Sequence, residues 1–156
     1  MREAAARPST PRDSLLEIND LRKFLEGKWE VSRQIDDRRL DQLGRFDGSA
    51  GFAVDGDDLI YDEDGELRLG THKGPAFQTY RYTFPSKRQA EVCFADGRPF
   101  HDLDLSNGAW ACTHLCGEDR YEGAFTALDR DSWRVIWRVR GPRKDLRLDS
   151  HYSRAL

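Results

Sequence analysis

The sequence predicts a mainly β protein: a closed up-and-down antiparallel barrel of about eight to ten strands, with one short N-terminal helix. Three observations support this prediction. From residue 28 onward, apolar and polar residues alternate with the period of two that is typical of half-buried strands. Turn signals recur about every eight to twelve residues, the spacing expected of short antiparallel strands. Helical patterns between the strands, which a parallel sheet would require, do not occur in this part of the sequence.

The predicted helix lies near the N-terminus. Ser14 and Glu17 match a capping box, in which the two side chains bond to free N–H groups of the first helical turn. Gly27 is expected to end the helix. The apolar stripe of the helix is expected to be Leu21, Phe24 and Leu25.

Residues 1–13 combine two prolines with Arg, Ala, Ser and Thr, and they are expected to form a disordered tail. A single barrel domain is then expected over residues 14–156. The tail lacks the apolar segment of a secretory signal, and the chain holds no apolar run of membrane-spanning length. With an odd count of three cysteines, the chain is expected to be cytoplasmic, with reduced thiols and no membrane partner.

Between the helix and the last hairpin, the alternation divides into short segments separated by turns that contain glycine. Tight turns are expected at Gly56-Asp57, Asp64-Gly65, Asp96-Gly97 and Asn107-Gly108, with a loop over 70–75. The predicted strands are 28–36, 44–54, 59–62, 66–69, 77–84, 90–95, 98–105, 109–116 and 121–128.

The last predicted element is a two-sided hairpin over residues 133–154. Its first strand alternates apolar with mostly cationic residues: Trp133, Val135, Trp137 and Val139 against Arg134, Ile136, Arg138 and Arg140. Gly141-Pro142 ends that strand, because proline lacks the N–H that a ladder requires. The alternation resumes from Leu146 to Tyr152. One face of the hairpin is therefore expected to pack, and the other to bind an anion or to face solvent.

The segment Leu25-Glu26-Gly27-Lys28-Trp29 resembles the first strand of lipocalin-like (calycin) barrels. The resemblance implies that Trp29 seals the closed end of the barrel and that an arginine of the last strand stacks on its ring. Arg154 and Arg147 are the candidates for this cation–π contact. Closure is also expected on physical grounds, since an open sheet would leave two edges free to aggregate.

A set of short motifs resembles a bacterial domain-of-unknown-function family, the one numbered 6314, over about residues 20–154. The family has no established activity, so the resemblance implies the fold class and leaves the function open. Leu146 departs from the pattern, since an aromatic residue often stands at that position. The motifs are FLEGxW at 24–29, GELxLG at 65–70, DGRPFH at 96–101, HLCGxDxY at 114–121 and WRVxGPRKD at 137–145.

Charge is distributed unevenly along the chain. Its formal net charge is −3, but residues 130–156 carry +5 and residues 1–129 carry −8. An acidic body argues against a nucleic-acid partner. A cationic end suits an anionic group on a small ligand, because a guanidinium binds carboxylate or phosphate in a bidentate manner.

These features favour a protein that binds a small, partly apolar molecule with an anionic group inside the barrel. Barrels of this size often hold one ligand. The expected ligand-binding residues are Arg138, Arg140, Arg143, Lys144, Tyr80, Tyr82, Trp133 and Trp137. Alternatively, the rings only fill the core and the arginines form a solvated face paired with Asp145 and Asp149.

Two other function classes remain open. The first is an enzyme with a histidine general base, for which the candidates are His101, His114, Asp119 and Tyr121. The same residues could instead form a buried hydrogen-bond network. The second is a protein-interaction module whose basic hairpin, with Arg143 and Lys144, docks on an acidic partner.

Cys112, His114 and Cys116, with His101, form a nominal set of zinc ligands. A flat strand separates residues two apart by nearly 7 Å, so no metal site is expected. The sequence identifies no cofactor and no oligomeric state.

Overall fold

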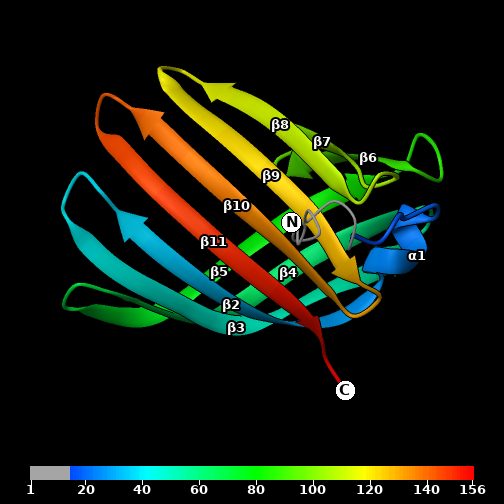
Figure 1. Cartoon of the computed structure of the whole chain (residues 1–156), viewed down its shortest axis with the longest axis horizontal. Helices are drawn as coiled ribbons and strands as arrows, with labels where there is room; N and C mark the ends of the chain where they lie inside the picture. The colour runs from blue at the N-terminus through cyan, green and yellow to red at the C-terminus, as the bar shows by residue number, and fades with distance from the viewer. Residues whose placement is uncertain (1–14) are drawn as a thin grey trace, which may run out of the picture.

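A computed structural model describes residues 15–156, which form one short helix and ten antiparallel strands in a nearly closed barrel (Figure 1). The predicted fold class is confirmed. The sheet order is β7-β6-β5-β4-β3-β2-β11-β10-β9-β8, so the first strand pairs with the last and every other pair is consecutive in the chain. The predicted tail over 1–13, and Ser14 of the predicted capping box, lie outside the described residues.

The elements follow one another through short turns. They are α1 (Leu21–Leu25), β2 (Gly27–Asp37), β3 (Gln42–Asp55), β4 (Asp58–Leu69), β5 (His72–Thr83), β6 (Gln89–Phe94), β7 (Pro99–Asp104), β8 (Ala109–Cys116), β9 (Asp119–Asp129), β10 (Ser132–Gly141) and β11 (Lys144–Arg154). In the described part of the chain, no helix is long and apolar enough to cross a membrane.

Trp29 and Arg154 hold the end of the barrel beside α1. Trp29 is fully buried, and its indole N–H donates to the carbonyl oxygen of Leu25 at 2.8 Å. The guanidinium of Arg154 lies 4.1 Å from the centre of the Trp29 ring and donates to the carbonyl oxygen of Phe24 at 3.0 Å. The predicted contact between Trp29 and an arginine of the last strand is therefore confirmed, with Arg154 as the partner.

The helix begins later than the sequence predicts. Asp20 caps it, since its carboxylate accepts a hydrogen bond from the Lys23 N–H at 3.1 Å. The predicted start over Ser14–Glu17 is wrong for the described residues 15–17, because the chain is not helical from residue 15 to Asp20. There, the Leu16 and Ile18 N–H groups bond to carbonyls of other parts of the barrel.

The predicted hairpin turn at Asp64-Gly65 is also wrong, because β4 runs unbroken through it. Gly65 pairs with Gly48 of β3. A Cβ on Gly65 would lie 2.6 Å from the Gly48 Cα, and one on Gly48 would clash with the Asp64 carbonyl oxygen. These glycines allow two strands to approach closely, and neither forms a turn.

The predicted loop over 70–75 is shorter in the structure, because β5 already begins at His72. Pro75 lies inside this strand, opposite Glu66 of β4. It is tolerated because β6 pairs only with residues 80–83 of β5, so the earlier part of β5 is an edge that needs no second ladder.

The barrel is open between β7 and β8, since no ladder joins these strands in the described chain. Trp110 partly bridges the gap, because its indole N–H donates to the carbonyl oxygen of Asp102 at 3.1 Å. The strands β6 and β7 have six residues each, whereas β4 and β5 have twelve. Much of β5 therefore has no strand on its β6 side.

Replacing Gly48 by Ala tests the close approach of β3 and β4. The new Cβ would meet the Asp64 carbonyl oxygen, so we expect unfolding in urea to show a loss of about 1–3 kcal/mol. Gly51→Ala is the matched control on the same strand, because its nearest atom would lie 3.9 Å away. We expect that variant to stay within about 0.5 kcal/mol of the wild type. Equal losses in the two variants would contradict this account.

Candidate functional site

A cavity of about 310 Å³ lies inside the barrel, and we call it the barrel cavity. It is lined by side chains of β2, β3, β4, β5, β10 and β11, and it opens to solvent beside the exposed Phe77 and Gln78 of β5. The volume falls at the lower end of the range for small-molecule pockets. Its wall is largely apolar, with Ile35, Phe46, Leu67, Ala76, Phe77, Tyr80, Val135, Trp137 and Leu148. Its polar lining residues are Arg33, Glu63, Gln78, Ser150 and Tyr152.

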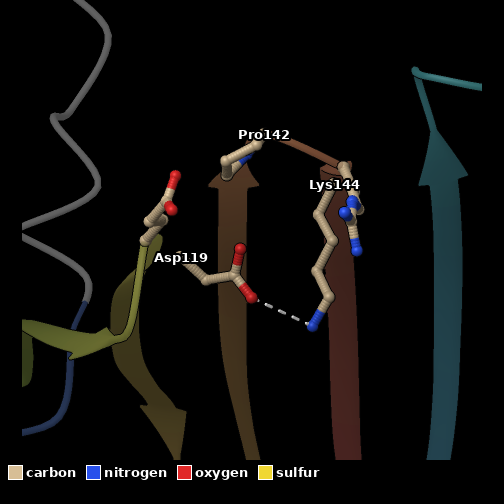
Figure 2. Close-up of a pocket in the computed structure, with 5 residues that line it drawn as sticks. Asp119, Pro142 and Lys144 are labelled. Carbon is tan, nitrogen blue, oxygen red and sulfur yellow. Dashed lines mark ion pairs between the residues drawn. The ribbon is translucent and has the colours of Figure 1, made fainter.

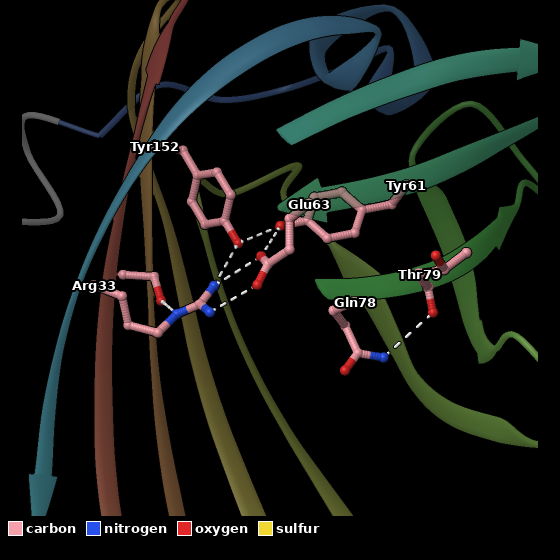
Figure 3. Close-up of polar contacts among 7 residues, drawn as sticks. Arg33, Tyr61, Glu63, Gln78, Thr79 and Tyr152 are labelled. Carbon is pink, nitrogen blue, oxygen red and sulfur yellow. Dashed lines mark hydrogen bonds and ion pairs between the residues drawn. The ribbon is translucent and has the colours of Figure 1, made fainter. Parts of the chain in front are cut away.

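Five side chains form a buried hydrogen-bonded group at this cavity, which we call the polar floor (Figure 3). Arg33 of β2 and Glu63 of β4 make a bidentate ion pair with N···O distances of 2.8 and 2.9 Å. Arg33 also donates to the Ser150 hydroxyl at 2.6 Å and to the Tyr152 hydroxyl at 3.3 Å. The Tyr61 hydroxyl donates to Glu63 and lies 2.8 Å from the Tyr152 hydroxyl.

The polar floor balances its own charge. Burial lowers the pKa of Arg33, but the hydrogen bond and the charge of Glu63 raise it, and the net result is a raised pKa. Burial also raises the pKa of both Tyr61 and Tyr152, so these hydroxyls stay neutral. The floor thus holds one cation, one anion and two neutral phenols, an arrangement that a buried site tolerates only when the charges are paired.

The structure places the predicted catalytic histidines among aromatic rings. The Nδ1 atom of His101 lies 2.8 Å from the carbonyl oxygen of Asp102, and the His101 ring lies 5.3 Å from the Trp137 ring. Burial lowers the pKa of His101 to about 4, so its imidazole is neutral at neutral pH. His114 packs 5.3 Å from the Phe100 ring and 5.9 Å from the Tyr121 ring.

Asp119 lies apart from both histidines, at the turn between β8 and β9. Its carboxylate is 3.3 Å from the Lys144 ammonium, and in the described chain it bonds to neither histidine (Figure 2). Lys144 also lies 5.9 Å from the centre of the Tyr121 ring. The four predicted catalytic residues therefore do not form one acid–base set, and their catalytic role stays a prediction.

The turns β8–β9 and β10–β11 enclose a surface hollow that we call the rim pocket (Figure 2). It lies at the end of the barrel opposite α1 (Figure 1). The carboxylate of Asp119 packs against Gly141, where a Cβ would clash with its Oδ1 atom. The rim pocket is lined by Glu118, Asp119, Pro142, Arg143 and Lys144, so it brings together two of the predicted ligand-binding cations and one predicted catalytic carboxylate.

Arg138 and Arg140 lie outside the barrel, because they alternate with Trp137 and the buried Val139. Arg138 is 2.9 Å from Asp145, at an angle that makes an ion pair without a hydrogen bond. Neither arginine lines the barrel cavity. Their part in ligand binding stays a prediction, and their placement matches the alternative of a solvated, paired face.

The predicted aromatic residues divide into two groups. Tyr80 and Trp137 line the barrel cavity. Tyr82 and Trp133 belong to the packed core, with exposed fractions of 4% and 2%. The Trp133 ring stacks on Tyr152 with a centroid distance of 3.8 Å, so the core continues directly beneath the polar floor.

Residues 25–154 match the model of a family described as Family of unknown function (DUF6314). The chain belongs to this family. The match covers all ten strands, from the end of α1 to the last residue of β11. No curated protein matched the DUF6314 chain.

Solved structures show the same fold at low sequence identity. An S-type phycobiliprotein lyase from Guillardia theta matches with a TM-score of 0.62 and 8% identity, over 87% of this chain and 91% of that one. A protein of unknown function from the DUF3598 family of Nostoc punctiforme matches with a TM-score of 0.64 and 13% identity. That match covers 91% of the DUF6314 chain but only 51% of the other protein.

Sequence reasoning missed Arg33 and Glu63, although a signal for both was present. Arg33 occupies the same face of β2 as Trp29 and Val31, and Glu63 shares a face of β4 with Tyr61. A charged residue on the apolar face of an alternating strand is unusual, because burial of an unpaired charge is costly. Two such residues in one DUF6314 barrel therefore point to a buried pair.

The cysteines and histidines of the DUF6314 barrel do not form a metal centre in the described chain, where no group of three or more His, Cys, Asp or Glu could hold a metal ion. Cys93, Cys112 and Cys116 are free. Burial raises the pKa of Cys112 to about 12, which keeps its thiol protonated.

Replacing Arg33 by Met would leave the Glu63 carboxylate buried without its partner. We expect a loss of about 3–5 kcal/mol in the free energy of unfolding, measured in urea. In the double variant Arg33→Met/Glu63→Gln the unpaired charge is gone, so part of the loss should be recovered. Arg45→Met removes a cation from an exposed ion pair with Asp47 and should change stability little. A loss in Arg33→Met no larger than in Arg45→Met would contradict the assigned role of the pair.

Proposed function

We propose that the protein binds one small, partly apolar molecule in the barrel cavity. The observation that carries this proposal is the cavity itself, about 310 Å³ with an apolar wall and a polar floor. Protein interiors are usually packed at the density of organic crystals, with few voids larger than a water molecule. A largely apolar hollow of this size, open to solvent on one side and reaching the barrel interior, therefore gives a small molecule both space and access.

The distribution of chemistry around the cavity supports the same proposal. Small-molecule sites combine mostly apolar walls with a few placed polar groups, which fix the orientation of the ligand. Here Tyr80 and Trp137 provide flat apolar surfaces, while Arg33 and Ser150 provide polar atoms in the same lining. The likeness to the phycobiliprotein lyase supports the proposal only through the shared fold.

For the anionic group that the sequence predicts on the ligand, we propose the rim pocket as the place of contact. Arg143 makes no ion pair within the described chain, and it lies beside Lys144 in that pocket. Lys144 is partly neutralised by Asp119 at 3.3 Å. The polar floor offers no uncompensated cation, because Glu63 already pairs with Arg33.

Titration with N-phenyl-1-naphthylamine tests the proposal, since this neutral dye fluoresces strongly in apolar sites. We expect saturable binding with one dye per chain. Ala76→Trp would fill the cavity from β5 and should weaken binding at least about tenfold, which corresponds to about 1.4 kcal/mol.

The matched control is Ala53→Trp, which adds the same side chain at an exposed position of β3 away from the barrel cavity. It should leave dye affinity unchanged. Circular dichroism of both variants checks that each one folds. Absence of saturable binding in the wild type, or equal affinity in Ala76→Trp and the wild type, would contradict the proposed function.

A further inference from the structure

The lining of the barrel cavity has no net charge. Within residues 15–156, Arg33 and Glu63 are the only lysine, arginine, histidine, aspartate or glutamate residues among those that line it. Burial raises the pKa of Tyr80 and of Tyr152, so both phenols are neutral in the working range of a protein. One positive and one negative charge therefore stand side by side, and each is neutralised by the other at 2.8 Å.

Two donors of the polar floor, one N–H and one O–H, have no hydrogen-bond acceptor within residues 15–156. A guanidinium has five N–H donors. Four of the Arg33 donors are used, on Ser150, on the two oxygens of Glu63 and on Tyr152. The second N–H of Nη1 has no acceptor within residues 15–156. The Ser150 hydroxyl accepts from Arg33, and its own proton likewise has no acceptor in that part of the chain.

The guanidinium lies between the Phe46 ring and its ion-pair partner Glu63. Its central carbon lies 4.9 Å from the centre of the Phe46 ring, so an aromatic face shields it on one side. Its outer edge points at Glu63, as Figure 3 shows. Arg33 nevertheless lines the cavity, and its side chain keeps an exposed fraction of 18%. Part of the Arg33 side chain is thus accessible from the cavity while its pair with Glu63 stays intact.

We infer that the barrel cavity selects a ligand whose part inside the cavity is uncharged and places a carbonyl-type oxygen, as in a ketone, amide or quinone, against Arg33 and Ser150. This inference rests on the proposed function, because it names the ligand class of the same cavity. A neutral acceptor oxygen gains a hydrogen bond from a charged donor, which is stronger than one between neutral groups. The apolar remainder of the ligand would lie along Tyr80 and Trp137.

A carboxylate at the same place is disfavoured by the charge already present. It would lose its hydration on entering the cavity, and it would lie close to the Glu63 carboxylate. Arg33 cannot offset this penalty with a full charge, because Glu63 occupies its bidentate edge. Selectivity against anions at the floor is therefore set by Glu63.

Isothermal titration calorimetry with three probes of similar shape tests the inference. They are 2-acetonaphthone, which carries a neutral ketone, 2-isopropenylnaphthalene, in which a CH₂ group replaces the ketone oxygen, and 2-naphthoate, which carries a carboxylate. We expect the ketone to bind most tightly. The alkene should bind about tenfold more weakly, since it lacks the acceptor for a charge-assisted hydrogen bond. The carboxylate should also bind more weakly than the ketone.

Glu63→Gln provides the decisive variant, because it keeps the shape of the side chain and leaves the Arg33 charge uncompensated. In this variant we expect 2-naphthoate to gain at least about tenfold in affinity relative to 2-acetonaphthone. Glu66→Gln is the matched control, since it removes the same charge from a half-exposed position of β4 that does not line the cavity. The control should keep the wild-type order of affinities.

The outcomes separate this inference from the proposed function. If none of the three probes binds, both are overturned. If the ketone and the alkene bind equally, or 2-naphthoate binds most tightly to the wild type, the cavity binds small molecules but the inference is wrong. The wild-type ranking decides this even if Glu63→Gln fails to fold. A folded Glu63→Gln variant with the wild-type ranking also overturns the inference.

Discussion

The buried ion pair between Arg33 and Glu63 is the constraint on which the rest of this barrel depends. Arg33 belongs to β2 and Glu63 to β4, so the pair joins the two strands on either side of β3. The guanidinium lies 4.9 Å from the centre of the Phe46 ring, which belongs to β3. Through Ser150 and Tyr152 the same group also reaches β11. A buried pair of this kind is weak evidence for stability, but it fixes which polar groups must face one another. Here it ties together the strands where the chain closes on itself.

The polar floor lies between a group of packed aromatic rings and the barrel cavity. On the side of α1, large rings fill the barrel: Trp29 and Trp133 pack 6.1 Å apart, and Phe52 packs 5.1 Å from Tyr82. On the other side lies the barrel cavity. Tyr152 belongs to both the packed rings and the polar floor, since its ring stacks on Trp133 and its hydroxyl joins the floor. The packing of Tyr152 against Trp133 fixes the position of the Tyr152 hydroxyl, which accepts a hydrogen bond from Arg33 beside the cavity.

Much of the fold follows from local pattern, and the errors arise where distant residues decide. The alternation in residues 133–154 predicts the closing hairpin and a packed aromatic face, because the period of two depends only on the strand itself. Asp64-Gly65 has the composition of a turn, yet it lies within β4 because Gly48 stands directly opposite and both strands need the space. No local rule carries that information.

The candidate site was harder to predict than the fold, for a related reason. The density of arginine near the C-terminus favours an anion site there, but strand alternation turns Arg138 and Arg140 outward. Arg33 and Glu63 stand at inward positions that the alternation alone identifies. Their pairing across 30 residues of sequence, and the cavity beside it, depend on barrel closure and could not be derived from either strand separately.

The most direct test of the account is to locate a bound probe by the methyl resonances of the protein. Isotope-labelled protein with saturating 2-acetonaphthone should show shifts concentrated on Ile35, Leu67, Val135 and Leu148, which line the barrel cavity. The methyl groups of Val54 and Leu115, which are exposed on the outside, should not move. Shifts at the exterior methyl groups with unchanged cavity resonances would contradict the claim that the space above the Arg33–Glu63 pair is a ligand site.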